Sequence, residues 1–281
     1  MNTDCFLKGH TALITGAGRG IGAAIAKELA SLGAKVILVG RTAARLEDIA
    51  AQINPANVKV VAADVRHTAW LKQLLAQQEQ IDIFIHAASG FAPYGPLELR
   101  SEDDIAEVLD TNLGAALRIS SLLLPGMKSR NYGMFLFIGS LAGSLGAKNQ
   151  VIYSTAKAGF SGLVKSLVVE NAPQDINAHL IELGLFDTER TREAMLDTVR
   201  ERIVAAIPAG RIGVPEEVAK AVRYLLSPDA KFLRGITLPV AGGAGLGVVP
   251  VNNKHKNKTT SNESSIKEGS SESVNSTFST S

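Results

Sequence analysis

Cysteine is almost absent from this chain of 281 residues, since Cys5 is the only one. An intrachain disulfide is therefore impossible, and a reducing compartment fits the sequence. The first residues lack the basic and apolar regions of a secretory signal. No run of about 18 apolar residues occurs, and the nearest, 236–251, is interrupted by Pro239, Pro250 and several glycines. These absences predict a cytoplasmic protein without a membrane span.

The chain also lacks an excess of charge of either sign. It carries 29 Lys and Arg against 27 Asp and Glu, which gives a net charge of +2. Nothing in this balance calls for a nucleic-acid partner. We expect no metal site. The length of the chain is sufficient for one large α/β domain with a substantial core.

Strand-like and helix-like segments alternate along most of the chain. This alternation predicts a parallel sheet covered by helices on both faces. Predicted strands end near Thr15, Val39, Ala62, Ile85, Ile138, Leu183 and Val240. Predicted helices cover roughly 20–32, 43–53, 68–80, 102–128, 151–171 and 215–227.

The composition changes near residue 248, where polar residues take over and apolar residues nearly vanish. We therefore predict a folded domain over 1–247 and a disordered polar tail over 248–281.

A glycine-rich loop follows the first predicted strand, 11–15, and precedes a segment of helical periodicity, 21–32. Strand, glycine turn and helix form the context in which a dinucleotide pyrophosphate is bound. The glycines let the backbone approach the phosphates, and the helix N-terminus favours their negative charge. The predicted contacts from this loop are Gly16, Gly18, Arg19, Gly20, Ile21 and Gly22.

The end of the second predicted strand lacks an acidic residue. NAD-preferring domains place an Asp or Glu there to bind the ribose hydroxyls, whereas this chain has Arg41. A guanidinium binds a 2′-phosphate well, and Arg19 lies in the glycine loop as well. The sequence therefore predicts NADPH rather than NADH, with a solvated surface role for Arg41 as the alternative.

Three residues near the middle of the chain are candidates for catalysis. Tyr153 and Lys157 are four residues apart and share one face of a predicted helix, and Ser140 follows a predicted buried strand. A nearby ammonium is expected to lower the pKa of the phenol towards neutral pH, where an acid-base group works best. Ser140 would hold a substrate carbonyl near that phenol. Taken alone, a Tyr and a Lys at this spacing are best interpreted as a chance pair. Their position after the glycine loop makes a catalytic pair the favoured interpretation.

With these motifs the chain resembles the short-chain dehydrogenase/reductase family, of the single-domain Tyr-Lys type, from about Leu7 to Gly243. The resemblance implies a doubly wound, seven-stranded Rossmann sheet. Thr15, Gly16, Gly20 and Gly22 fill the fixed places of the family's TGxxxGxG loop. The family's catalytic tetrad corresponds to Asn112, Ser140, Tyr153 and Lys157, with the Asn holding a relay water and the Lys also bonding the nicotinamide ribose. Further implied cofactor contacts are Asp64 and Val65 at the adenine, Ala87, and Thr188 at the carboxamide.

Two family motifs are altered. The usual Asn-Asn-Ala-Gly is His86-Ala87-Ala88-Ser89 here, and the Pro before Gly184 is Leu183. His86 is either an extra acid-base group or a packed structural histidine, and we favour the second. Asp64 has a second possible role as a cap of the following helix.

The stretch 211–219 is typical of 3-oxoacyl-carrier-protein reductases and their near relatives. That stretch is structural and says little about the substrate. The general likeness to a 3-oxoacyl reductase implies reduction of 3-oxoacyl thioesters of acyl carrier protein or coenzyme A, as in fatty acid biosynthesis. Lys128 and Arg130 are candidates for docking an acidic carrier, but 170–175 has no basic residue. Segment 188–207 is expected to cover the substrate. Arg190 and Arg192 could meet a phosphate of the acyl carrier, but a solvated, charged helix is the favoured interpretation.

Two other functions stay open at this point. The same residues suit reduction of another small ketone, sugar or polyketide-like carbonyl. A non-catalytic NADP-binding regulator is the rival of a different class, although such proteins often lose the Tyr or Lys. The family also implies a homotetramer formed through the helices near 102–128 and 151–171 and the last strand.

Overall fold

A computed structural model describes residues 5–247, and the predicted polar tail lies outside them. Seven parallel strands form one sheet in the order β3-β2-β1-β4-β5-β6-β7, so the predicted Rossmann sheet is confirmed. The strands are β1 (Thr11–Thr15), β2 (Lys35–Gly40), β3 (Val58–Ala62), β4 (Ile83–His86), β5 (Gly133–Ile138), β6 (Ile176–Leu183) and β7 (Thr237–Val240).

Alternate residues of the central strands enter two separate cores. In β1, Leu13 packs in one core with Ile37 and Phe84, whereas Ile14 packs in the other with Leu38. Successive side chains of a strand point to opposite faces, so each central strand must be apolar on both sides. β6 lies between β5 and β7 and is buried along its whole length, including its polar residues Asn177, His179 and Glu182.

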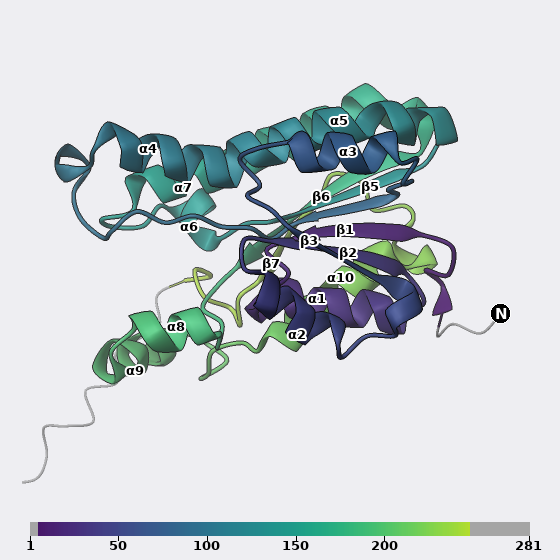
Figure 1. Cartoon of the computed structure of the whole chain (residues 1–281). Coiled ribbons are helices and arrows are strands. Elements are labelled where there is room, and N and C mark those ends of the chain that lie inside the picture. Colours follow the sequence, from purple (N-terminus) through teal and green to yellow (C-terminus); the bar gives the residue numbers. More distant parts are fainter. Residues whose placement is uncertain (1–4, 248–281) are drawn as a thin grey trace, which may run out of the picture. The chain divides into compact units, whose positions relative to one another are not determined.

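Helices cover both faces of the sheet (Figure 1). One layer contains α1 (Gly20–Ser31), α2 (Ala43–Ala50) and α10 (Pro215–Leu226). The other contains α3 (Ala69–Ala76), α4 (Glu102–Leu109), α5 (Ala115–Arg130), α6 (Leu141–Leu145) and α7 (Val151–Asn171). Two further helices, α8 (Glu189–Ala194) and α9 (Asp197–Ala206), lie apart from both layers. No helix within 5–247 is long and apolar enough to cross a membrane.

The predicted helices differ from the observed ones mainly at their ends. The helix predicted over 68–80 stops at Ala76, and Gln78 just beyond it has a φ of 61°, which a helix cannot continue. The helix predicted over 102–128 is three pieces, because a π-helical turn, η4 (Asp110–Gly114), joins α4 to α5. Such turns often mark functional sites, and η4 contains Asn112.

The strand order reverses between β1 and β4. After β3 at one edge, the chain crosses the sheet to place β4 beside β1. In doubly wound sheets, ligands bind outside the carboxyl ends of the strands at this switch point. The loops after Thr15 and His86 therefore flank the expected binding crevice.

The phenylalanine cluster beneath α7 gives a test of the packing. Phe137 is fully buried and its ring lies 5.4 Å from that of Phe160. We expect Phe137→Ala to lower the free energy of unfolding by about 3–5 kcal/mol, because it removes buried apolar surface and leaves a cavity. Denaturant titration measures this loss. Phe232→Ala is the control, since Phe232 is fully exposed, and an equal loss in both variants would contradict this packing.

Candidate functional site

The glycine loop closes against the end of β4. Gly16 has a φ of +70°, and a Cβ there would lie 2.7 Å from the backbone nitrogen of Ala88 and 2.8 Å from the carbonyl oxygen of Ala87. A Cβ on Gly22 would collide with the carbonyl oxygen of Gly16. The loop therefore needs glycine at both places for its own turn and for close packing of α1.

The start of α1 is open to an anion. Arg19 precedes the helix, no side chain caps its first turn, and that turn has no acidic residue. The N–H groups of Gly20 and Ile21 are therefore not neutralised by a carboxylate, which suits a pyrophosphate. Together with the tight glycine turn, this donor set fits a nicotinamide dinucleotide.

The ribose end of this site has several arginines. Arg41 follows β2 and is exposed. The Cβ of Arg45 lies 3.3 Å from the position of a Cβ on Gly18, so Arg45 also borders the glycine loop. Sequence reasoning missed Arg45, although a second arginine four residues after Arg41 was a signal available to it.

Asp64 is the acidic side chain near these arginines, and Arg66 neutralises it. Nη2 of Arg66 lies 2.7 Å from Oδ2 of Asp64, and Nε lies 3.1 Å from each carboxylate oxygen. The hydrogen bonds from Arg66 hold the pKa of Asp64 below its ordinary value. Asp64 does not cap α3, whose N-cap is Thr68. Val65, the next predicted contact, is buried.

Tyr153 and Lys157 project from the first two turns of α7. Nζ of Lys157 lies 5.6 Å from the centre of the Tyr153 ring and donates a hydrogen bond to the carbonyl oxygen of Ile138 at 2.9 Å. Ser140 is the N-cap of α6, where its Oγ accepts from the N–H of Ala142 at 3.1 Å. The Ser140 hydroxyl also lies near the Tyr153 phenol, where it acts to lower the phenol's pKa. The structure thus brings three predicted catalytic residues together.

Asn112 is fully buried in η4 and joins this group through Ser89. Its Nδ2 donates to the carbonyl oxygens of Gly90 at 2.9 Å and Val108 at 2.8 Å. Its Oδ1 accepts from the Ser89 hydroxyl at 3.0 Å. With every polar atom of the amide bonded, the side chain has one fixed orientation.

Ser89 is a site residue that sequence reasoning treated only as small. Its hydroxyl bonds Asn112 and also lies against the Tyr153 phenol, where it acts to lower the phenol's pKa. The signal was its place in the altered Asn-Asn-Ala-Gly motif, where this chain has a hydroxyl instead of glycine. Ser89 links the asparagine of the tetrad to its tyrosine.

The predicted lowering of the tyrosine pKa is wrong. Burial raises the pKa of Tyr153 above its ordinary value, against smaller opposing effects of Ser140, Ser89 and Arg190. Burial also lowers the pKa of Lys157 to about 7. The ammonium is itself short of solvent, so its charge does not outweigh the loss of water around the phenol. At neutral pH the phenol is protonated and is a proton donor.

His86 is a buried structural residue, as favoured from the sequence. Its Nε2 lies 2.9 Å from the carbonyl oxygen of Asn112 and its Nδ1 lies 3.0 Å from Oγ1 of Thr15. Because a carbonyl only accepts, Nε2 carries the proton and Nδ1 accepts from Thr15. Burial, followed by the charge of Lys157, lowers the pKa of His86 to about 3. The ring is neutral and ties β1 to η4.

Thr188 begins α8 and lies beside the glycine loop. Its Oγ1 accepts from the N–H of Thr191 at 3.2 Å, and its Cγ2 is 3.3 Å from the position of a Cβ on Gly20. Arg19 forms an exposed ion pair with Glu193 of α8 at 3.4 Å. Thr188 therefore places the start of α8 beside the glycine loop, and its predicted cofactor contact stays a prediction.

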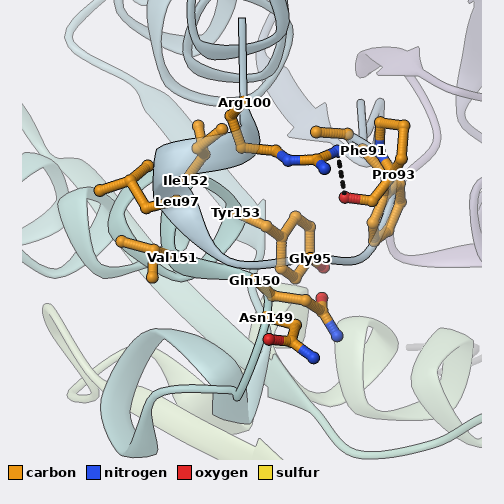
Figure 2. A pocket seen from close by; sticks show the side chains of 11 residues that line it. Phe91, Pro93, Gly95, Leu97, Arg100, Asn149, Gln150, Val151, Ile152 and Tyr153 are labelled. Atoms are coloured by element: carbon orange, nitrogen blue, oxygen red, sulfur yellow. Dashed lines mark hydrogen bonds between the residues drawn. The ribbon is translucent and has the colours of Figure 1, made fainter.

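A crevice of about 310 Å³, including space open to solvent, lies next to Tyr153. Figure 2 shows Tyr153 in its middle, with Phe91 and Pro93 on one side and apolar side chains on the other. Those apolar side chains are Leu97, Val151 and Ile152. The Arg100 guanidinium donates to the Pro93 carbonyl oxygen at 3.1 Å, which braces the loop over the crevice. Within 5–247, no three His, Cys, Asp or Glu side chains form a group able to hold a metal.

The buried His86 predicts a pH dependence of stability. Its pKa is about 3 in the folded protein and about 6.5 when unfolded. Between these values the unfolded chain binds the extra proton, so stability falls as the pH falls below 6.5 and is unaffected above it. The expected slope from this residue is about 1.4 kcal/mol per pH unit.

His86→Asn is expected to flatten that slope, as measured by urea titrations between pH 7 and 4. His179, whose pKa burial lowers to about 4, remains and retains part of the acid sensitivity. Identical slopes in the two proteins would contradict a neutral, buried His86.

Known proteins similar to this chain agree with its fold. Residues 16–245 match the family model described as enoyl-(acyl carrier protein) reductase. A curated relative, the 3-oxoacyl-[acyl-carrier-protein] reductase FabG of Pseudomonas aeruginosa, is 36% identical over 243 residues, covering 84% of this chain and 98% of that protein. FabG of Vibrio cholerae is also 36% identical, over 241 residues, with the same coverage.

A solved structure of a short-chain dehydrogenase/reductase family protein superimposes with a TM-score of 0.78 at 31% identity. The match covers 84% of this chain and 97% of that one. This family binds nicotinamide cofactors. The chain belongs to the short-chain dehydrogenase/reductase family, and it is an oxidoreductase that acts on CH–OH groups.

Proposed function

We propose that this protein is an NADPH-dependent reductase that converts 3-oxoacyl thioesters to 3-hydroxyacyl thioesters. The observation that carries the proposal is the convergence of Ser140, Tyr153 and Lys157 beside an apolar crevice. The named activity of the two FabG relatives supports the thioester as substrate. The catalytic roles of Asn112 and the three converging residues are part of this proposal.

The bound nicotinamide would supply the hydride for the carbonyl carbon. Ser140 would donate a hydrogen bond to the substrate carbonyl oxygen, and Tyr153 would give that oxygen its phenolic proton. The raised pKa of Tyr153 keeps this proton available at neutral pH. Lys157 and Asn112, held by bonds to Ile138 and to Gly90, Val108 and Ser89, would return a proton to the phenol after each turnover.

The preference for NADPH rests on the arginines at the ribose end. Arg41 and Arg45 have no carboxylate within ion-pair distance among the described residues, so both are available to a 2′-phosphate. Asp64 would repel that phosphate, but its pairing with Arg66 removes most of this effect. Gly16, Gly18, Gly20, Ile21 and Gly22 would hold the pyrophosphate, with Arg19, Val65, Ala87 and Thr188 as further contacts.

A carrier-protein partner has weaker support than a thioester substrate. Lys128 is exposed near the end of α5. Arg130, the other predicted docking residue, is instead bonded to Asp82 at 3.2 Å and to the carbonyl oxygen of Ile81 at 2.7 Å. Because Arg130 is occupied within the protein, docking would depend on Lys128 and residues not predicted from the sequence. Coenzyme A thioesters are thus the simpler test substrates.

Two alternative functions can be distinguished from the proposed one. Reduction of a small ketone or sugar would use the same four residues and is the second candidate. A non-catalytic NADP-binding role is disfavoured because the phenol, the ammonium and both serine hydroxyls converge.

A homotetramer and a cytoplasmic location remain proposals. Exposed apolar side chains on α5 and α7, namely Leu117, Val151 and Val169, would be covered in such an assembly.

Tyr153→Phe tests the reaction. We expect wild-type protein to oxidise NADPH, followed at 340 nm, on addition of acetoacetyl-coenzyme A. The variant should retain NADPH binding and lose about 10²- to 10⁴-fold in kcat, because it lacks the proton donor. Crotonyl-coenzyme A is the control substrate, since it has a C=C bond and no ketone.

Turnover of crotonyl-coenzyme A alone would replace the proposal with an enoyl reductase. Turnover of a ketone panel but neither thioester would favour the second candidate. Binding of NADPH without any turnover would favour the non-catalytic role.

Arg41→Ala combined with Arg45→Ala tests the cofactor. Loss of two cations near the 2′-phosphate should raise KM for NADPH about 10- to 100-fold, as expected when charged hydrogen bonds are lost, and leave KM for NADH nearly unchanged. Steady-state kinetics with both cofactors measures this. Arg223→Ala is the control, because Arg223 pairs with Glu28 at 3.5 Å on α10 and α1. A wild-type preference for NADH would contradict the assignment.

A further inference from the structure

A column of three stacked groups stands at the catalytic tyrosine. The Phe91 ring lies 4.4 Å from the Tyr153 ring at an interplanar angle of 19°. Cζ of Arg190 lies 3.7 Å from the centre of the Phe91 ring. Tyr153 lies on α7, Phe91 lies in the loop after β4, and Arg190 lies on α8. Three segments that are distant in the sequence therefore meet here.

Stacking leaves the hydrogen-bonding edge of a guanidinium free. The five N–H donors of an arginine lie in its plane, and a ring that covers one face uses none of them. No carboxylate or carbonyl of the described residues bonds the guanidinium of Arg190. As a residue Arg190 is exposed, so a small molecule can approach its guanidinium, whose pKa is lowered by partial burial.

The neighbouring arginines differ in this respect. Arg192 and Arg200 both pair with Asp187, at 3.5 and 3.6 Å, and Arg19 pairs with Glu193. Arg190 alone among these four has an aromatic face in place of a carboxylate. Its charge also acts on Tyr153, where it lowers the pKa of the phenol. The column therefore places an available cation near the reacting carbonyl.

We propose that Arg190, held on Phe91, is a substrate-binding residue for an acceptor oxygen one methylene away from the carbonyl that is reduced. Only one ring separates the guanidinium from Tyr153. Consider a substrate whose reacting carbonyl oxygen is hydrogen-bonded to the Tyr153 phenol and which carries a second oxygen two carbons further along. Such a substrate can reach past the thickness of the Phe91 ring to the guanidinium. A 3-oxo thioester and a 3-oxo carboxylate both carry such an oxygen, and a simple ketone does not. This inference deepens the proposed function and rests on it for the thioester.

The test compares substrates with and without the second oxygen. We expect Arg190→Ala to raise KM roughly 10- to 100-fold for S-acetoacetyl-N-acetylcysteamine, a thioester without phosphates, as for loss of a hydrogen bond from a charged donor. KM for 2-butanone and the Kd for NADPH should not change. Arg190→Lys should be intermediate, because it keeps the charge and loses the planar fork. Arg192→Ala is the matched control on the same helix.

Each other outcome decides the inference. Equal KM values in wild type and Arg190→Ala for both the short thioester and acetoacetate would overturn it. An effect with acetoacetyl-coenzyme A but none with the short thioester would assign Arg190 to a phosphate and also overturn it. A rise confined to acetoacetate would keep the site and assign it to a free carboxylate.

Failure of the proposed function is a separate result. If wild-type protein reduces neither thioester, calorimetric titration of acetoacetate and 2-butanone into the NADP-loaded protein decides the inference. Tighter binding of acetoacetate that is lost in Arg190→Ala would support it. Equal binding in both proteins would overturn it.

Discussion

The site depends on a buried chain of hydrogen bonds around His86. The N–H of Ala88 donates to Oγ1 of Thr15 at 3.3 Å, Thr15 donates to Nδ1 of His86, and Nε2–H of His86 donates to the Asn112 carbonyl. These bonds connect β1, β4 and η4 where the strand order reverses. A neutral imidazole with both nitrogens bonded in an apolar surrounding has one tautomer and one orientation. The glycine loop and the tetrad asparagine are thereby fixed relative to each other.

Burial controls the chemistry of the groups that face this framework. It raises the pKa of Tyr153 and lowers that of Lys157 to about 7. At neutral pH the phenol is therefore uncharged and the Lys157 amine is only partly protonated, since each group lacks water. Their acid-base properties therefore depend on what else enters the site, which couples the proton donor to the occupant of the crevice.

Much of the fold was predictable from local pattern. Apolar runs set all seven strands, and α7 was predicted with its observed bounds, because periodicity and burial agree there. The π-helical turn at Asn112 was not predicted, since its sequence continues the helical pattern of α4 and α5. Among the predicted site residues, Asn112, Ser140, Tyr153 and Lys157 converge. Ser89 and Arg45 were missed because their importance arises from neighbours far away in the sequence.

The sequence by itself determined the sheet, the glycine turn, the order of the tetrad residues and the absence of an acid after β2. These features are local, because each depends on residue type and spacing within a few positions. Only the tertiary structure decided that Arg66 pairs with Asp64 and that Asp82 pairs with Arg130. It also decided that the pKa of the Tyr153 phenol lies above that of a free tyrosine. It also decided that Arg190 reaches Phe91. Desolvation and pairing arise between segments distant in sequence, so they exist only once the chain has folded.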